Sequence, residues 1–361
     1  MRVQRKSIDF KGHNFYVGID VHKKSWTVTI LNEEYEHKTF SCSPSVENIS
    51  KYLERNFKGG DFNIVYEAGF CGFGVQRGFA KLGMRCIVIH PADVPNSSKQ
   101  RQQKTDVHDS RSLARYLRGG LLKGIWIPDE QLEEERHLVR QRFTIVKDLS
   151  RVKNRVKSLL MSSDIKIPEH ITTSQSRHWS KVYTKWLDSV IEEDQGSLGG
   201  VLRNHVDQAE ELREVKKRVT MQIRKLSQTD RYKEDYELMV SVPGIGLMTG
   251  MTILTEIGDI KRFKRLDELC SYVGLIPRMN NSGERTVTGK LVNRGRKEIK
   301  IMLIEASWVA IRHDSALMLK FGELSKKMNK NKAIIRIARK LLNRIRHILI
   351  NKVPYEKGIV Q

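Results

Sequence analysis

Alternating apolar and polar positions dominate the first quarter of the chain and predict β-strands. Phe15–Val21 and Trp26–Leu31 are rich in β-branched and aromatic residues, which favours neighbouring strands, and Glu36–Ser41 continues the pattern as a third. Phe62–Tyr66 predicts a fourth strand. Cys86–Ile89 is nearly all apolar, as expected of a fifth strand that is buried on both faces.

Helical spacing of apolar residues separates and follows these strands. Val46, Ile49 and Leu53 share one face of a helix that begins after the third strand. Phe73–Leu82 and Asp106–Leu117 predict two more helices. The element order is therefore βββαβαβα, and the predicted fold class of this part is α/β.

Long, highly charged helices are predicted beyond Asp129, over Glu130–Ser162, Gln175–Glu193 and Val201–Leu226. The apolar residues of the first advance by threes and fours, which is typical of a helix that packs against a partner helix. This segment therefore predicts an elongated coiled-coil arm. Its apolar stripe consists of Val139, Phe143, Val146, Leu149, Val152, Val156, Leu159 and Leu160.

The last third of the chain predicts a mainly helical domain. Val242–Gly246 followed by a helix over Leu247–Ile257 has the form of a helix-hairpin-helix, in which glycines let backbone N–H groups approach a phosphate. A polar segment, Pro277–Gly295, predicts turns. The other expected helices cover Leu266–Val273, Arg296–Arg312, Ala316–Lys327 and a basic C-terminal stretch that ends near Lys352. The predicted domains are residues 1–128, 129–230 and 231–361.

Charge indicates a polyanionic partner. The 361 residues include 65 Lys and Arg against 42 Asp and Glu, a formal net charge of +23. Such an excess favours nucleic-acid binding, because neutralising phosphates releases counterions. The C-terminal helix is the most basic element, with ten Lys and Arg and no acid from Ser325 to Lys352.

Other features of the composition exclude several classes of protein. No run of eighteen apolar residues predicts a membrane span, and no GxxxxGK[ST] loop predicts nucleotide binding. The cysteines lack a CxxC pair, which argues against a zinc module or a disulfide framework and favours a reducing cytoplasm. They are Cys42, Cys71, Cys86 and Cys270.

Four acidic residues form the candidate catalytic set. Asp20 lies within an otherwise apolar strand, where an unpaired carboxylate is costly unless it binds a metal, pairs with a base or caps a turn. Glu67 follows the fourth strand, and Asp106 and Asp109 are three apart at a helix start, on one helical face. Taken alone, Asp106 is most simply an N-cap and Glu67 a surface strand end. Combined with the βββαβαβα order, the four acids predict an RNase H-like sheet that holds two Mg²⁺ ions at a scissile phosphate.

Neighbouring histidines and one serine have patterns that do not by themselves indicate chemistry. His22, His90 and His108 lie close to the acids in the sequence, and a histidine on a polar loop is as common as one that activates water, so no role is assigned. Ser282 lies in Asn280–Arg285 among basic residues. By its spacing alone it is a turn serine.

The N-terminal motifs resemble those of a known family. They are Gly18-Ile19-Asp20-Val21-His22-Lys23, Tyr66-Glu67-Ala68-Gly69 with Gly72-Phe73-Gly74, and Lys104-Thr105-Asp106-Val107-His108-Asp109-Ser110-Arg111-Ser112-Leu113-Ala114. They are similar to those of the DEDD transposases of insertion sequences in the family numbered one hundred and ten. Four C-terminal motifs agree in order: Val242-Pro243-Gly244-Ile245-Gly246, Tyr272-Val273-Gly274-Leu275-Ile276-Pro277, Ser282-Gly283-Glu284-Arg285 and Leu303-Ile304-Glu305-Ala306-Ser307-Trp308.

The resemblance implies a RuvC-like nuclease domain that a coiled coil joins to a transposase domain. It implies that the four acids bind divalent ions, Mg²⁺ or Mn²⁺, and that Ser282 attacks DNA and forms a covalent phosphoserine link. It also implies a homo-oligomer, a dimer or tetramer in which acids of one protomer meet the serine of another. The expected partners are donor DNA, target DNA and a structured noncoding guide RNA. The family often has a second serine before the nucleophile, where this chain has Asn281.

Three functional hypotheses follow. The first is a transposase or recombinase that uses metal ions and Ser282 under RNA guidance, with pilin-gene invertases as relatives by the same resemblance. The second is a metal-dependent nuclease or Holliday-junction resolvase in which water replaces the serine. The third is a nucleic-acid-binding protein without catalysis, in which the acids are only helix caps and strand ends.

Overall fold

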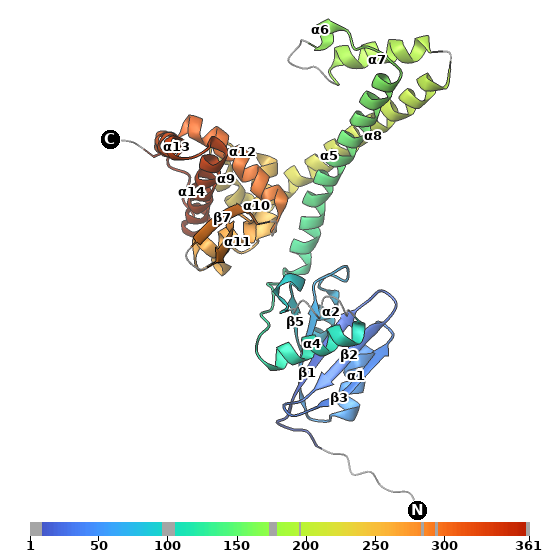
Figure 1. Cartoon of the computed structure of the whole chain (residues 1–361), viewed down its shortest axis with the longest axis vertical. Helices are drawn as coiled ribbons and strands as arrows, with labels where there is room; N and C mark the ends of the chain where they lie inside the picture. Colours follow the sequence, from blue (N-terminus) through green and yellow to red (C-terminus); the bar gives the residue numbers. More distant parts are fainter. Residues whose placement is uncertain are drawn as a thin grey trace, which may run out of the picture. The chain divides into compact units, whose positions relative to one another are not determined.

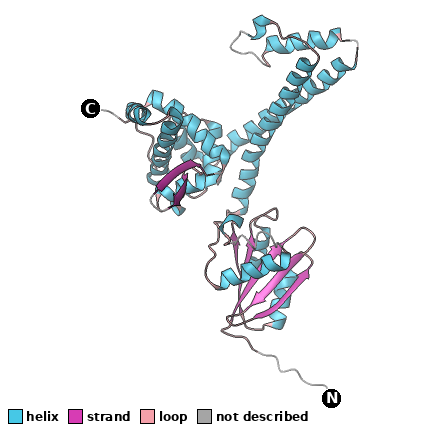
Figure 2. Ribbon diagram, viewed as in Figure 1, coloured by secondary structure: helices cyan, strands magenta, loops and turns pink. Residues whose placement is uncertain are grey.

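The structure, a computed structural model, describes residues 9–95, 105–172, 179–194, 196–282, 285–292 and 295–358. The chain forms two compact units, Met1–Ile127 and Pro128–Gln361 (Figure 1). The first is built on a sheet and the second is mostly helical (Figure 2). Along the described residues, no helix is both long and apolar enough to cross a membrane.

The N-terminal unit contains a five-stranded sheet in the order β3-β2-β1-β4-β5. Its strands are β1 (Asn14–Val21), β2 (Trp26–Leu31), β3 (Glu36–Cys42), β4 (Asp61–Glu67) and β5 (Arg85–Ile89). The first three pair antiparallel, whereas β1, β4 and β5 pair parallel. The helices are α1 (Val46–Asn56), α2 (Gly74–Lys81) and α4 (Asp106–Arg118), with a short turn η1 (Pro91–Asp93). The predicted order of strands and helices is confirmed.

Strand alternation gives the sheet two different faces. Phe15, Val17 and Ile19 of β1 are fully buried in a core that also contains α1 and α2. The residues between them point to the opposite face, where α4 covers β1, β2 and β4. There Val65 of β4 packs with Leu113 of α4. The end of β1 on the α4 face is where Asp20 lies.

Gly18 lets α4 approach β1 closely. A Cβ atom at this position would lie 2.1 Å from the carbonyl oxygen of Ser110 and 2.6 Å from the backbone nitrogen of Ala114. Two polar contacts fix α4 over the sheet: a buried hydrogen bond of 2.9 Å joins the hydroxyls of Thr29 and Ser110, and Arg111 pairs with Glu36 at 2.7 Å. Only glycine at position 18 allows this arrangement.

The helical unit begins with a long antiparallel helix pair. Its elements are α5 (Glu130–Ser162), α6 (Glu169–Thr172), α7 (Lys181–Glu193) and α8 (Ser197–Leu226). The predicted apolar stripe of α5 is buried against α8 in part through Leu149 and Val152, which contact Ala209. Of the predicted helix Gln175–Glu193, residues 175–178 lie outside the described residues, and α7 begins at Lys181.

Helix α8 begins four residues before the predicted start. Asp194 accepts hydrogen bonds from the backbone N–H groups of Gly196 and Gly199 and so satisfies the first turn. A Cβ atom at Gly199 would lie 2.8 Å from the carbonyl oxygen of Ile191. Gly199 therefore serves close packing of α8 on α7, whereas Gly200 has open space around it.

The rest of the unit packs around the C-terminal helix. Its elements are α9 (Lys233–Val240), α10 (Leu247–Ile257), η2 (Ile260–Arg262), α11 (Leu266–Val273), β6 (Pro277–Ser282), β7 (Arg285–Leu291), α12 (Lys297–His313), α13 (Ser315–Lys327) and α14 (Lys330–Asn351). The apolar face of α14 is buried through Ile334, Ala338, Leu341, Ile345 and Ile348. The same core contains Val139 of α5 and Ile223 of α8, so the base of the helix pair and the C-terminal helices share one core. The division at residue 230 stays a prediction.

The prediction of turns over Pro277–Gly295 is wrong, because β6 and β7 pair as an antiparallel hairpin. Asparagine, serine and glycine are frequent in this segment and lower its apparent strand propensity. Backbone pairing between the two strands, from Pro277 with Leu291 to Ser282 with Arg285, outweighs that weak local preference.

The predicted helix-hairpin-helix segment is present as α9, a turn and α10. Gly244 in the turn has φ of +86°, and a Cβ atom there would lie 2.7 Å from the carbonyl oxygen of Ala306 on α12. This glycine therefore serves packing against α12. Gly246, which precedes α10, has open space around it, and phosphate binding at this turn stays a prediction.

We expect Gly18→Ala to destabilise the N-terminal unit by at least ~2 kcal/mol, because the added methyl group overlaps the backbone of α4. The free energy of unfolding in denaturant measures the effect. Gly74→Ala is the matched control: its Cβ atom meets nothing within 4 Å, so a change below ~1 kcal/mol is expected. Equal effects of the two substitutions would contradict the close approach of α4.

Candidate metal centre

Carboxylates from β1 and α4 meet at the carboxyl end of the central strand. The ligand atoms of Asp20, His22 and Asp106 all lie within 4.8 Å of one another. His22 Nε2 is 3.1 Å from Asp20 Oδ2 and 3.3 Å from Asp106 Oδ1. Asp20 is the more enclosed acid, with 22% of its side chain exposed against 57% for Asp106. Two of the four predicted acids are thus brought together.

The start of α4 explains why Asp106 reaches this cluster. Thr105 is the N-cap, and its hydroxyl accepts a hydrogen bond from the backbone N–H of His108 at 3.2 Å. Asp106 is therefore the first residue of the helix, and its carboxylate is not used as the cap. The simple explanation of Asp106 as an N-cap is wrong, because the neighbouring threonine supplies the capping oxygen.

Asp109 and Glu67 take different positions around the cluster. The Asp109 carboxylate acts on Asp20 electrostatically, although its oxygens are not among the three grouped ligand atoms. Glu67 is the last residue of β4. The register of the two parallel strands pairs Tyr66 of β4 with Ile19 of β1, so the next residues, Glu67 and Asp20, are level with each other. Residues level in register point to the same face of a sheet, here the face that α4 covers. Their role as ligands stays a prediction.

Burial raises the pKa of the Asp20 carboxyl above its ordinary value. The negative charges of Asp106 and Asp109 raise this pKa further, while His22 opposes the shift through its charge and hydrogen bond. Desolvation and like-charge repulsion both disfavour the ionised form of a carboxylate, and a nearby cation favours it. The cluster therefore places repelling acids where a positive charge would stabilise them.

The donor set fits a hard divalent cation. Oxygen ligands from carboxylates are those that Mg²⁺ and Mn²⁺ prefer. Asp20 and Asp106 supply such oxygens within reach of one another, with Asp109 near enough to affect Asp20. His22 is the member that the sequence pattern did not select, since a histidine two residues after a strand aspartate is common on polar turns. The sequence feature that could have identified His22 is its position two residues after Asp20 in the same motif.

The predicted nucleophile lies in the other unit. Ser282 is the last residue of β6, and its backbone pairs with Arg285 at the start of β7. Its side chain is outside the described part of the structure, so its role stays a prediction.

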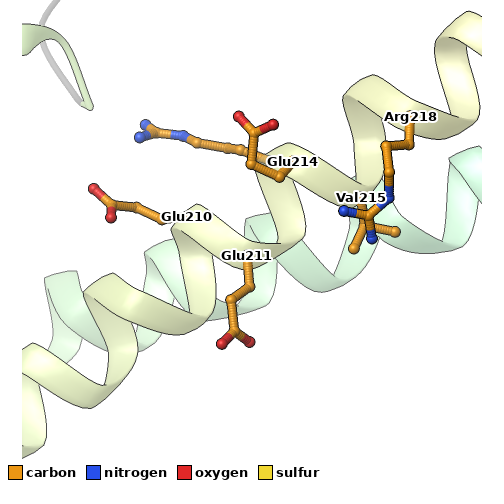
Figure 3. Close-up of a pocket in the computed structure, with 6 residues that line it drawn as sticks. Glu210, Glu211, Glu214, Val215 and Arg218 are labelled. Carbon is orange, nitrogen blue, oxygen red and sulfur yellow. The ribbon is translucent and has the colours of Figure 1, made fainter.

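A depression on helix α8 differs from the candidate metal centre in its charge. It has a volume of about 670 Å³ and is lined from α8 alone, by Glu210, Glu211, Arg213, Glu214, Val215 and Arg218. Figure 3 shows the acids Glu210, Glu211 and Glu214 on successive turns and neighbouring positions of this helix. Acids and arginines of one helix offset each other here, so this depression lacks the concentrated positive charge that would attract nucleic acid.

The fold and the acidic cluster define a mixed α/β unit with a candidate metal centre at the end of its sheet, followed by a mostly helical unit. Two family models match the chain in this same order. One, described as "Transposase" and built on the DEDD transposases of IS110, covers residues 17–163, and the other, described as "Transposase IS116/IS110/IS902 family", covers residues 236–323. The chain belongs to the IS110 family of transposases.

Individual relatives agree with this family. The chain is 27% identical over 299 residues to y4qE of Sinorhizobium fredii, which carries the name of a transposase, covering 81% of this chain and 71% of the relative. It is 26% identical to the transposase for insertion sequence element IS1533 of Leptospira borgpetersenii, covering 68% and 70%. It is 23% identical to the pilin gene-inverting protein of Moraxella bovis, covering 95% and 98%. The expectation of an insertion-sequence transposase that acts on DNA is confirmed.

We expect Mg²⁺ or Mn²⁺ to stabilise the wild-type protein, by ~2.7 kcal/mol at a hundredfold excess over the dissociation constant. Asp20→Asn should abolish this increment. Without divalent ions, the same variant should unfold at higher denaturant concentration than the wild type, because one repelling charge has been removed. Denaturant unfolding with and without the metal measures both effects.

Asp61→Asn is the matched control, because Asp61 is an exposed acid at the opposite end of β4. This variant should keep the metal-dependent stabilisation. Loss of the increment in both variants, or in neither, would contradict a metal centre at Asp20.

Proposed function

We propose that this transposase cuts and rejoins donor and target DNA with divalent metal ions at an RNase H-like N-terminal domain and with Ser282 as the nucleophile. The observation that carries the proposal is the meeting of Asp106 with Asp20 at the carboxyl end of β1. The strand order and the covering helix support an RNase H-like domain.

The four acids have one shared role in this proposal. Asp20, Glu67, Asp106 and Asp109 hold the ions, and bound ions polarise the phosphoryl group and lower the pKa of the attacking hydroxyl. His22 contacts both Asp20 and Asp106 and keeps the two carboxylates in position before the ions bind. The close packing of α4 on Gly18 fixes the distance between the two elements that carry these acids.

The serine carries the covalent step. Ser282 Oγ loses its proton and forms a bond to phosphorus, while the bond from phosphorus to one deoxyribose oxygen breaks and that oxygen takes up a proton. The phosphodiester is thereby exchanged for a phosphoserine ester of similar energy. A deoxyribose hydroxyl of the second DNA then reverses the exchange, so strands are rejoined without ATP.

The partners in this proposal are DNA, RNA and further copies of the chain. A structured noncoding RNA pairs with donor and target DNA, so the protein itself reads mainly backbone and shape. The net charge of +23 supports binding to both nucleic acids. In the homo-oligomer, acids of one protomer act with Ser282 of another.

Ser282→Ala should abolish a covalent protein–DNA adduct and lower strand exchange by on the order of a thousandfold or more, because the nucleophile is removed. The measurement uses donor and target DNA, Mg²⁺ and RNA transcribed from the flanking element, with denaturing electrophoresis to trap the adduct. Ser271→Ala is the control serine, since it lies on the same unit in α11 and should leave the adduct intact.

The same assay distinguishes the serine chemistry from the second hypothesis. Cleavage that persists in Ser282→Ala, with no adduct in the wild type, would indicate a nuclease or resolvase with water as nucleophile. Omission of the RNA tests guidance in the same assay, and strand exchange that is equally fast without RNA would contradict it.

A mixture of the inactive Asp20→Asn and Ser282→Ala variants should regain adduct formation. For a dimer with shared centres, roughly a quarter of the wild-type level is expected, because half of the dimers are mixed and each mixed dimer holds one intact centre of two. The same trapping assay measures it after subunit exchange. A mixture that stays inactive, although exchange of labelled subunits is complete, would show that each chain uses its own acids and serine.

A further inference from the structure

A large groove lies in the helical unit beside the hairpin that carries Ser282. Its volume is about 1100 Å³, and α11, the β6–β7 hairpin, α12, the end of α13 and α14 all contribute to its lining. This exceeds the ~300–1,000 Å³ of ordinary small-molecule clefts, so it has room for more than one nucleotide. Figure 1 shows β7, α11 and α14 next to one another in this unit.

The lining of the groove is positively charged. Among the residues that the structure describes, five cationic side chains and no acidic side chain line it: Lys300, Lys332, Arg336, Arg339 and Lys340. The members on α14 recur at intervals of four, three and one, which places them on one face of the helix, about one turn or ~6 Å apart along its axis. A row of this kind matches a row of phosphates along a nucleic-acid strand.

Ion pairs within the fold occupy Arg339 of the groove and leave Lys332, Arg336 and Lys340 available. Arg339 pairs with Asp267 at 2.9 Å, and Arg344, further along α14, pairs with the buried Asp314 at 2.7 Å. No acid in the described part of the chain lies within ion-pair distance of Lys332, Arg336 or Lys340. Three cations without a counter-charge on one exposed face repel one another, and an anion in the groove relieves that repulsion.

Apolar side chains also line the groove. They are Leu266, Leu275, Pro277, Leu291, Met328 and Ile335. A paired duplex presents its phosphates and sugars to a protein surface and keeps its bases stacked inside. An unpaired strand can place a base on apolar side chains while its phosphates contact cations. The combination of cationic and apolar lining residues therefore fits an unpaired strand better than a duplex.

We propose that this groove binds an unpaired segment of the DNA strand that is exchanged, next to the β6–β7 hairpin. The proposal rests on the proposed role of Ser282 for the choice of DNA. Pro277 at the edge of the groove begins β6, and Ser282 ends it five residues later, ~17 Å away in an extended strand. A strand held in the groove is thereby kept within a few nucleotides of the hairpin end that carries the serine.

The test compares nucleic-acid affinity of the full-length protein and a triple variant, Lys332→Gln, Arg336→Gln and Lys340→Gln. Glutamine keeps the helix propensity of lysine and arginine and removes the charge. The matched control is Lys233→Gln, Lys326→Gln and Lys357→Gln, which removes three exposed charges from the same unit outside the groove lining. Fluorescence anisotropy is measured with one labelled sequence as single-stranded DNA, as duplex DNA and as single-stranded RNA.

We expect the groove variant to lose at least about tenfold in affinity for single-stranded DNA at moderate salt, and the control less than about threefold. The slope of log affinity against log salt should fall by ~2, because three phosphate contacts at ~0.7 each are lost. The affinity for the duplex should change as little as in the control.

A second variant tests the apolar lining. Ile335→Asp places a carboxylate among the apolar lining residues and should weaken single-strand binding, whereas Ile335→Leu should not. Equal losses for duplex and single strand, or a loss for RNA and not for DNA, would overturn the proposal. Ser282→Ala should bind single-stranded DNA as the wild type does, so failure of the groove and failure of the serine chemistry give different results.

Discussion

The close contact between α4 and β1 at Gly18 is the constraint on which the candidate metal centre depends. The carbonyl oxygen of Ser110 occupies the space where any other residue at position 18 would place its Cβ atom. Because α4 is held this close, its first residue, Asp106, comes within reach of Asp20 two positions further along β1. Two acids that repel each other are thus kept together by packing and by the Thr29–Ser110 hydrogen bond beneath them. The free energy of this packing offsets the electrostatic cost of the cluster.

A second constraint of the same kind organises the helical unit. Glu256 is buried near the end of α10, and Arg140 of α5 donates to it twice, at 2.6 and 2.8 Å. Arg296, before α12, lies 3.2 Å from the same carboxylate, and Arg136 donates to the carbonyl oxygens of Thr255 and Glu256. One buried acid thereby joins α5, α10 and the start of α12. Loss of its charge would leave arginines partly buried without a partner, which is far more costly than loss of an exposed pair.

The sequence predicted most of the elements because their patterns are local. Apolar alternation located β1 and β2, and helical spacing located α14. It did not predict the use of Thr105 as the cap of α4, since threonine and aspartate are both good caps and the choice depends on the sheet below. The β6–β7 hairpin was missed because its residues favour turns, although its two strands are close in the sequence. The groove was out of reach for a different reason, since Leu266, Leu291 and Arg336 are far apart in the sequence and meet only in the folded unit.

The distribution of charge explains how one chain can hold both an acidic centre and a strongly basic surface. The net charge of +23 overstates the positive charge that α14 offers to a ligand. Some cations of this helix form ion pairs inside the fold. Asp314 holds Arg344, Asp267 holds Arg339 and Asp235 holds Lys352, which ties α14 to α13, α11 and α9. Lys332, Arg336 and Lys340, which these acids do not pair, line the groove. Structural ion pairs therefore select which positive charges remain to bind phosphate, and the same helix can stabilise the core and attract a nucleic-acid strand.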